Sequence, residues 1–299
     1  MNYDFIKIIC EKYGAEYAEN QPLAPYTSFK IGGCCPVLVK PNGTPCLCEL
    51  VKEFNSHGED YKIMGKGSNL LISDKGVSFP VITLSDMGEI RFEGEKAHCG
   101  SGAALISVCR EAAEKALGGL EFAYGIPGSL GGAVYMNAGA YGGEMKDIVK
   151  SVTYLDDTGK IRRADSSKLD FSYRHSFFSG KKYIITDVEI KLQKGDKQLI
   201  NAKMRELMEK RRERQPLEYP SAGSTFKRPE GDYAGRLIEA AGLKGFSVGD
   251  AQVSEKHCGF VVNKGNAAFN DVKSVIEKVK EKVKETSGID LECEVIIWE

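Results

Sequence analysis

The sequence lacks a long apolar run and lacks an excess of either charge. Its 299 residues include 41 Lys and Arg against 42 Asp and Glu, so the net charge at pH 7 is −1. A chain this close to neutral has no overall field that attracts nucleic acid or an anionic membrane surface. No apolar stretch is long enough to span a bilayer, and Asp4 and Lys7 interrupt the apolar N-terminal segment, unlike a signal peptide. We therefore expect a cytoplasmic protein with no nucleic-acid, membrane or obligate protein partner.

The cysteine spacing of known metal sites is missing as well. Cys34 and Cys35 are adjacent, Cys46 and Cys48 are one residue apart, and His57 is the only histidine near them. Zinc sites usually space paired cysteines more widely, as in CxxC. An odd number of scattered cysteines, nine in all, also gives no disulfide framework. We expect reduced thiols that are buried or half-buried, and no metal site.

Apolar patterns predict a mixed α+β protein. In the first helix Phe5, Ile8, Ile9 and Tyr13 are expected to share one face. Asn270 or Asp271 is expected to cap the last helix. The expected helices are 1–20, 44–58, 103–119, 201–214 and 270–288. The expected strands and hairpins are 35–41, 61–67, 89–102, 151–164, 183–193 and 291–299.

Glycine is concentrated in one stretch, Gly125–Gly143 (GIPGSLGGAVYMNAGAYGG), which holds seven of the chain's 33 glycines. A flexible linker would lack ordered apolar residues, yet Ile126, Leu130, Val134 and others are interleaved with these glycines. Because glycine permits backbone conformations and close approaches that other residues do not, the segment favours contact between backbone and a ligand over a structural turn alone.

A second glycine-rich turn lies in 63–76 (IMGKGSNLLISDKG). Leu70 stands where a dinucleotide fingerprint needs its third glycine, and no Gly-Lys-Ser/Thr ends the segment, so it is neither a Rossmann turn nor a P-loop. Such a turn can still present successive amide hydrogens to an anion, with Ser68 and Asn69 adding side-chain donors. Two such turns indicate a large phosphorylated cofactor.

Five motifs in order carry a family resemblance: GKGSNLLISDKG, GIPGSLGGAVYMNAGAYGG, FSYRHSFF, SAGSTFKRP and LECEV. From Tyr26 to the C-terminus the chain resembles the UDP-N-acetylenolpyruvoylglucosamine reductase family, in its shorter class. The resemblance implies the two-subdomain FAD-binding fold of the vanillyl-alcohol oxidase type plus a C-terminal α+β substrate domain. The implied domains are FAD-binding subdomains 1–88 and 89–198 and a UDP-sugar-binding domain 199–299.

The resemblance also implies the reaction. NADPH reduces a non-covalent FAD, and the enolpyruvyl group of the UDP-sugar is reduced to UDP-N-acetylmuramate for bacterial peptidoglycan. The implied FAD-binding residues are Gly65, Lys66, Gly67, Ser68, Asn69, Leu70, Gly125, Ile126, Pro127, Gly128, Ser129, Gly131, Gly132, Asn137, Gly139 and Ala140.

Three residues match the family's catalytic positions. Ser224 matches the proton donor, although a serine in a glycine-containing turn often only forms the turn. Arg174 and Glu294 match the groups that stabilise charge on the substrate. From the residues alone Glu292 is an equal candidate, and only the family alignment favours Glu294.

Two basic residues are expected near the anionic substrate. Arg214 aligns with a diphosphate-binding position, and Lys227 is placed to stabilise the Ser224 alkoxide. The chain also departs from the family pattern: Arg228 replaces an asparagine, and Ile296 follows Val295 where the family often has arginine. Both departures concern substrate contacts.

Two other functions fit parts of the sequence. An FAD-dependent oxidase of the same fold often binds flavin covalently, and its C-terminal domain would not carry SAGSTFK and LECEV. A non-catalytic nucleotide-binding module would purify without colour and would not turn yellow with added FAD.

Overall fold

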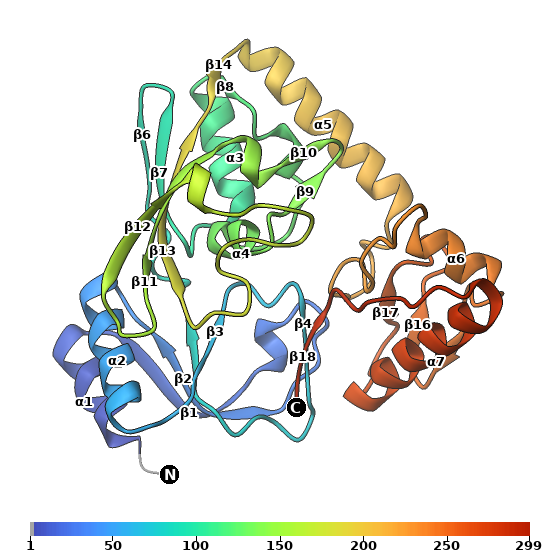
Figure 1. Cartoon of the computed structure of the whole chain (residues 1–299), viewed down its shortest axis with the longest axis horizontal. Helices are drawn as coiled ribbons and strands as arrows, with labels where there is room; N and C mark the ends of the chain where they lie inside the picture. Colours follow the sequence, from blue (N-terminus) through green and yellow to red (C-terminus); the bar gives the residue numbers. More distant parts are fainter. Residues whose placement is uncertain (1–2) are drawn as a thin grey trace. The chain divides into compact units, whose positions relative to one another are not determined.

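The computed structural model describes residues 3–299, and the chain divides into two compact units. Each unit consists of several chain segments, so the polypeptide passes between the units more than once (Figure 1). The first comprises Met1–Glu19, Val37–Lys66 and Phe79–Lys210; the second comprises Asn20–Pro36, Gly67–Ser78 and Arg211–Glu299. The three-domain division expected from the sequence stays a prediction.

One layer of the first unit is a four-stranded sheet with helices packed on it. The strand order is β1-β2-β5-β3, and β5 runs parallel to both β2 and β3. Its elements are β1 (Glu16–Pro22), β2 (Cys34–Lys40), β3 (Lys62–Met64), β5 (Val81–Thr83), α1 (Asp4–Tyr13) and α2 (Thr44–Ser56). Pro45 lies in the first turn of α2, where its missing N–H costs nothing, and Gly58 follows the helix with a φ of +65°. Both helices bury apolar faces in one shared core.

The other layer of the first unit is a five-stranded antiparallel sheet of order β12-β11-β13-β7-β6. The two hairpins predicted from the sequence, β6–β7 and β11–β12, are confirmed. The strands are β6 (Ile90–Glu93), β7 (Lys96–Gly100), β11 (Val149–Leu155), β12 (Ile161–Asp165) and β13 (Ile184–Lys191). Helices α3 (Leu105–Glu114) and α4 (Leu130–Tyr135) share its apolar core. Short elements complete it: β8 (Leu117–Gly118), η2 (Glu121–Ala123), β9 (Gly139–Ala140), β10 (Gly143–Glu144), η3 (Met145–Asp147), η4 (Ser166–Lys168) and β14 (Gln193–Lys194).

The second unit combines a small antiparallel sheet, two helices and a parallel strand pair. The sheet order is β15-β16-β17, and α7 packs on it (Figure 1). The long C-terminal helix buries the five apolar residues predicted for its face: Val272, Val275, Ile276, Val279 and Val283. The elements are η1 (Ala24–Tyr26), β4 (Leu70–Ile72), α6 (Ala234–Ala240), β15 (Ser247–Val248), β16 (Ala251–Val253), β17 (Val261–Asn263), α7 (Phe269–Ser287) and β18 (Ile296–Trp298); α5 (Lys197–Arg214) ends in this unit.

Several element boundaries differ from the sequence prediction. The first helix ends at Tyr13 and buries Ile6 and Ile9, whereas Ile8 is 64% exposed. Residues beyond it form β1, because Gly14 adopts a left-handed conformation that terminates the helix. In α7, Asp271 is the third helical residue, and its carboxylate accepts the Ala268 N–H. At the C-terminus only the last part of 291–299 is strand.

The thiols are placed as the composition predicts. Six of the nine cysteines are buried and three are half-buried. Burial raises the pKa of Cys99 and of Cys109 to about 12, so these thiols stay protonated at neutral pH. Within residues 3–299, no group of His, Cys, Asp and Glu has metal-site geometry, and no helix is long and apolar enough to cross a membrane.

Candidate active site

In the glycine-rich turn 65–70, contacts within the protein already require a glycine. Gly67 is buried with a φ of +58°, and a Cβ there would lie 2.1 Å from the carbonyl oxygen of Tyr26. The Gly67 carbonyl in turn accepts the Ser28 N–H at 3.1 Å. A side chain at this position therefore collides with backbone whether or not a ligand binds.

Asn69, next in this turn, is bonded to the segment that carries Glu294. Its side-chain Nδ2 donates to the Glu294 carbonyl at 3.0 Å, and its own carbonyl accepts the Ile296 N–H at 3.0 Å. Directly after these bonds, β4 and β18 pair in parallel, with Leu70 opposite Ile296 (Figure 1). Two segments far apart in the sequence are thus joined at the turn.

The glycines of 125–143 serve two different purposes. Gly131 is buried, and a Cβ there would lie 2.7 Å from the Ser101 Cβ; Gly139 and Gly143 are similarly crowded by Gly143–Glu144 and Phe122. Gly132, by contrast, is exposed. A Cβ added there would have one described neighbour within 4 Å outside its own helix backbone, the Ser129 Oγ at 3.3 Å. Only some of these glycines therefore leave backbone open to a ligand.

Ser129 links the two glycine-rich segments within the first unit. Its hydroxyl accepts the Gly132 N–H at 3.3 Å, which caps α4. A Cβ at Gly65 would lie 2.6 Å from the same hydroxyl oxygen. The exposed Gly65 and Gly132 therefore lie on either side of Ser129.

Ser101 is a polar residue that the sequence analysis missed. Its hydroxyl is buried, has no hydrogen-bond partner among residues 3–299, and belongs to the residue that crowds Gly131. A buried hydroxyl without a partner is costly, so a ligand atom is a natural partner for it. The open backbone at Gly132 and this hydroxyl fit a cofactor that lies along α4. The motif GSGAA gave a signal, since a second small-residue cluster precedes α3.

Asn137 is buried and supports the turn that carries Arg174. Its Nδ2 donates to the Ser172 carbonyl at 3.0 Å and to Glu144 at 2.6 Å, and its Oδ1 accepts the Lys146 N–H at 2.9 Å. The Asn137 residue itself is 1% exposed. Asn137 thus contacts protein groups, whereas its predicted contact with FAD stays a prediction.

Arg174 lies at the tip of a tight turn. Ser172 and His175 exchange backbone hydrogen bonds at 3.2 Å, and Arg174 between them has a φ of +54°. A non-glycine residue in the left-handed region is uncommon and is enriched at functional sites. Its guanidinium carbon lies 5.1 Å from the centroid of the Tyr173 ring, within cation–π range.

Ser224 and Glu294 lie on segments that are paired through backbone hydrogen bonds. The Glu294 N–H donates to the Thr225 carbonyl at 2.8 Å, and Phe226 and Cys293 form an antiparallel bridge. Gly223 precedes Ser224 with a φ of +76°, the turn that the sequence predicted at this glycine. The structure therefore brings two of the predicted catalytic residues together in the second unit.

Thr225 is the second residue missed by sequence reasoning. It is fully buried, its hydroxyl oxygen accepts the Val261 N–H at 3.0 Å, and its own N–H donates to the Gly259 carbonyl at 2.8 Å. These two bonds, together with the bond from the Glu294 N–H to the Thr225 carbonyl, fix the backbone next to Ser224. A threonine between a serine and a phenylalanine carries no sequence signal for this role.

The basic residues around Ser224 have acidic and aromatic neighbours. The Lys227 ammonium forms an ion pair with Glu292, whose side chain is 70% exposed, while Glu294 is half-buried. Arg228 lies over the Tyr233 ring at 4.5 Å, and Arg214 is exposed at the end of α5. Glu292 is thus paired at the surface, and the choice of Glu294 between the two carboxylates stays a prediction.

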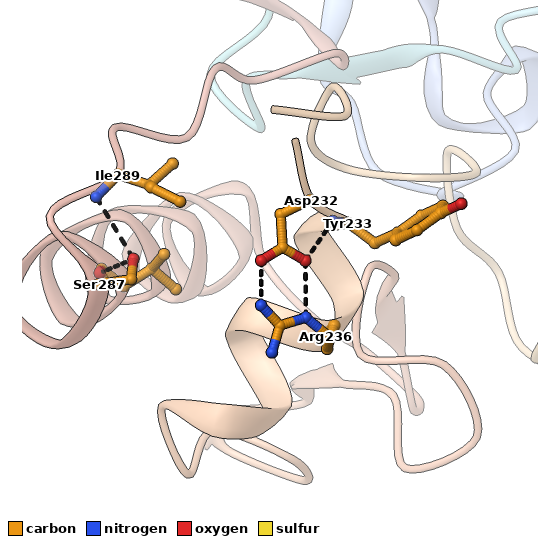
Figure 2. A network of polar contacts seen from close by, with 6 residues as sticks. Asp232, Tyr233, Arg236, Ser287 and Ile289 are labelled. Carbon is orange, nitrogen blue, oxygen red and sulfur yellow. Dashed lines mark hydrogen bonds and ion pairs between the residues drawn. The ribbon is translucent and has the colours of Figure 1, made fainter. Parts of the chain in front are cut away.

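A polar network fixes the start of α6 near Tyr233. Asp232 accepts the Tyr233 N–H and the Arg236 Nε, each at 2.6 Å, and forms an ion pair with the same guanidinium (Figure 2). The Arg236 hydrogen bond is the main cause that lowers the pKa of Asp232 to about 2. In the first unit, hydrogen bonds from Thr158 and the Lys160 backbone likewise hold the pKa of Asp156 far below its usual range.

Comparison with known proteins identifies two conserved parts. Residues 215–298 match the sequence profile described as UDP-N-acetylenolpyruvoylglucosamine reductase, C-terminal domain, and residues 36–165 match an FAD binding domain. A UDP-N-acetylenolpyruvoylglucosamine reductase of Caldanaerobacter subterraneus subsp. tengcongensis is 47% identical over 278 residues, 93% of this chain and 92% of the relative. The protein of that name from Pseudothermotoga lettingae is 48% identical over 96% of this chain and 100% of the relative.

Comparison with solved structures points to the same protein family. The crystal structure of UDP-N-acetylenolpyruvylglucosamine reductase from Thermus caldophilus aligns with a TM-score of 0.81 at 35% identity, covering 95% of this chain and 99% of that chain. A berberine bridge enzyme variant aligns with a TM-score of 0.52 at 14% identity over 64% of this chain and 44% of that chain, a likeness of fold alone. The predicted α+β FAD-binding fold with an additional C-terminal domain is confirmed.

Proposed function

The chain belongs to the UDP-N-acetylenolpyruvoylglucosamine reductase family of FAD-binding oxidoreductases, and from this premise we propose that it reduces the enolpyruvyl group of UDP-N-acetylenolpyruvoylglucosamine to UDP-N-acetylmuramate. NADPH is the proposed reductant. The proposed setting is bacterial peptidoglycan synthesis in the cytoplasm. The placement of Glu294 against Thr225, next to Ser224, is the observation that carries this proposal.

The two glycine-rich segments are the proposed cofactor site. When bound there, FAD supplies the hydride that NADPH delivers to it. The exposed backbone at Gly65 and Gly132 and the buried hydroxyl of Ser101 support this placement. At Gly67 and Gly131 a side chain would also collide with protein atoms, and the contact of these two glycines with FAD stays a prediction.

The proposed chemistry of the protein concerns charge and one proton. As hydride adds to one vinyl carbon, negative charge develops on the carbon that bears the carboxylate. Arg174 stabilises this charge as a cation, and Glu294 does so as a hydrogen-bond donor when its carboxyl group is protonated. Ser224 then transfers its hydroxyl proton to that carbon and regains a proton from solvent.

The proposed substrate site lies in the second unit. The substrate carries a diphosphate and a carboxylate, while the chain as a whole is nearly neutral. Local cations must therefore hold it, and the exposed Arg214 and the half-buried Lys227 are the proposed contacts. Arg228, held over Tyr233, stands where family members often have asparagine, so it is the position at which substrate contacts of this chain are expected to differ.

Two half-reactions measured separately test the proposed function. Anaerobic addition of NADPH to the FAD-loaded protein is expected to bleach the flavin absorbance, and later addition of UDP-N-acetylenolpyruvoylglucosamine is expected to restore it. Covalent flavin retained on a denaturing gel, or a protein that takes up no FAD, would favour an oxidase or a binding module instead. Bleaching without recovery would contradict the proposed substrate.

Adjacent glycines in α4 test the position of the cofactor. In Gly132→Ala the added Cβ would lie 3.3 Å from the Ser129 Oγ, so this hydroxyl must shift slightly; the variant is expected to weaken FAD binding and to lower the melting temperature of the apoprotein less than Gly131→Ala does. Gly131→Ala is the matched control: overpacking against Ser101 should destabilise the apoprotein by about 1–3 kcal/mol. Unchanged FAD affinity in Gly132→Ala, measured by flavin fluorescence, moves the cofactor away from this backbone.

A further inference from the structure

We propose that Asn69 is a positioning residue that couples the occupied cofactor turn to the carboxylate of Glu294. This inference rests on the proposed function, because it needs FAD at the turn and Glu294 at the substrate. It assigns the Asn69 side chain a role toward the protein, in place of a role as an anion donor.

Glu294 is held from both sides by hydrogen bonds to its own backbone. Its N–H donates to the Thr225 carbonyl at 2.8 Å, and its carbonyl accepts the Asn69 Nδ2 at 3.0 Å. The first bond ties it to the segment of Ser224, and the second ties it to the glycine-rich turn. Together they fix the peptide planes on both sides of the Glu294 Cα, and so the direction in which its side chain leaves the backbone.

The Asn69 bond differs from the others in being made by a side chain. Directly after this bond, the segments pair through their backbones. The Asn69 carbonyl accepts the Ile296 N–H at 3.0 Å, and β4 runs parallel to β18 for three residues. That pairing covers 296–298, and the Glu294 carbonyl lies two residues before it. The amide of residue 69 is what extends the ladder by two residues to the catalytic position.

A cofactor that orders the turn therefore orders Glu294 as well. Residues 67 and 69 belong to one tight turn, whose Gly67 conformation is fixed by Tyr26 and Ser28. An anion bound to this turn restrains the Asn69 backbone, and the amide passes that restraint to Glu294. Removal of the amide should leave FAD bound and Glu294 displaced.

Hydrogen–deuterium exchange tests the coupling without measuring activity. In wild type, FAD loading of the apoprotein is expected to slow exchange in peptides from both the turn, 63–72, and the Glu294 segment, 290–295. In Asn69→Ala and in the similarly sized Asn69→Leu, FAD should still protect the turn but no longer protect 290–295. Ser28→Ala, which removes a 3.4 Å hydroxyl bond to the Gly67 carbonyl in the same turn, is the control and should behave as wild type.

Half-reaction rates provide the second measurement. The Asn69 variants should be reduced by NADPH within about twofold of the wild-type rate, and their reoxidation by the UDP-enolpyruvyl sugar should slow about tenfold or more. FAD protection of 290–295 that persists in both variants overturns the inference. So does a loss of FAD affinity with slowed reduction, which would make Asn69 a cofactor ligand. Failure of the wild-type protein itself to bind FAD or to be reoxidised would count against the proposed function and not against the role of Asn69.

Discussion

The turn that carries Arg174 and the paired segments that carry Ser224 and Glu294 are supported in opposite ways. At 172–175 the tip residue has a φ of +54°, and a buried side chain, Asn137, holds the Ser172 carbonyl. At 224–226 and 292–294 the backbone supplies the support, through bonds from Glu294 to Thr225 and from Lys227 to Glu292. The first arrangement depends on one side-chain amide, whereas the second combines these backbone bonds with bonds from the Asn69 amide to the Glu294 carbonyl and from the Val261 N–H to the Thr225 hydroxyl.

This difference separates the effect of a functional group from the effect of its support. In the backbone-paired segments, a side chain can be removed with little change to the position of its neighbours. In the Arg174 turn, a distant substitution at the supporting amide is expected to displace the guanidinium. Substitutions should therefore have purely local effects at Ser224 and both local and transmitted effects at Arg174.

The largest effect is expected from Ser224→Ala. The variant removes only an oxygen, and the backbone pairing should keep Glu294 in place, so FAD content and reduction by NADPH should stay near wild type. Reoxidation by the UDP-enolpyruvyl sugar should slow by about 100- to 10,000-fold because the general acid is lost. Stopped-flow absorbance of the flavin measures both steps.

Ser221→Ala is the control for that experiment, because Ser221 lies three residues before and pairs with Val262 through its backbone. It should have a mild effect. Rapid reoxidation in Ser224→Ala would remove this serine from the mechanism and assign the proton to water or Glu294.

The next effect is expected from the charge-stabilising pair. Arg174→Ala and Glu294→Gln should each leave flavin reduction intact and slow reoxidation by about 100- to 1,000-fold, the usual cost of one lost stabilising group. Glu292→Gln is the matched control, since that carboxylate is exposed and paired with Lys227. Near-normal turnover in Glu294→Gln together with collapse in Glu292→Gln would reverse the choice of carboxylate.

A smaller, transmitted effect is expected from Asn137→Ala. Loss of its bond to the Ser172 carbonyl should let the Arg174 turn relax, slowing reoxidation by about 10- to 100-fold. Asn263→Ala is a matched control in the second unit, because Asn263 is also buried, at 3% exposure, and holds the Phe29 carbonyl. It should lower the melting temperature comparably without the same slowing of reoxidation. Equal kinetic effects in both variants would mean that the Asn137 effect reflects stability alone.

Much of the fold was predictable because periodic segments dominate it. The α7 face and both hairpins follow from apolar spacing and turn residues, and the structure has them as expected. The predicted first helix is longer than the observed one because Gly14 terminates the helix, and Ile6, not Ile8, lies on its buried face. Periodicity identifies a helix better than it identifies its ends.

The motifs predict residues for the candidate site but do not predict the contacts that support them. The motifs place Ser224 and Glu294, and the structure joins their segments. Glycine density predicts contact between backbone and a ligand, and the structure shows in addition that Gly67 and Gly131 are needed for contacts inside the protein. The roles of Ser101, Thr225 and the two asparagines depend on tertiary contacts between distant segments, which one sequence does not contain.

The smallest effect is expected at Asp232, which lies in the backbone-supported unit and fixes only the start of α6. Its pKa is lowered to about 2, chiefly by Arg236, whereas an unfolded aspartate titrates near about 4. The folded state therefore gains stability from the ionised carboxylate above about pH 4, and this gain disappears as pH falls toward 2. Asp232→Asn should lower the melting temperature of the apoprotein at pH 5 by no more than about 3 °C, and the gap to wild type should close between pH 4 and about pH 2.5. Arg236→Gln removes the same pairing and should show the same pH dependence. A gap that stays constant over this range would mean that Asp232 contributes through its backbone hydrogen bond to Tyr233 and not through its charge.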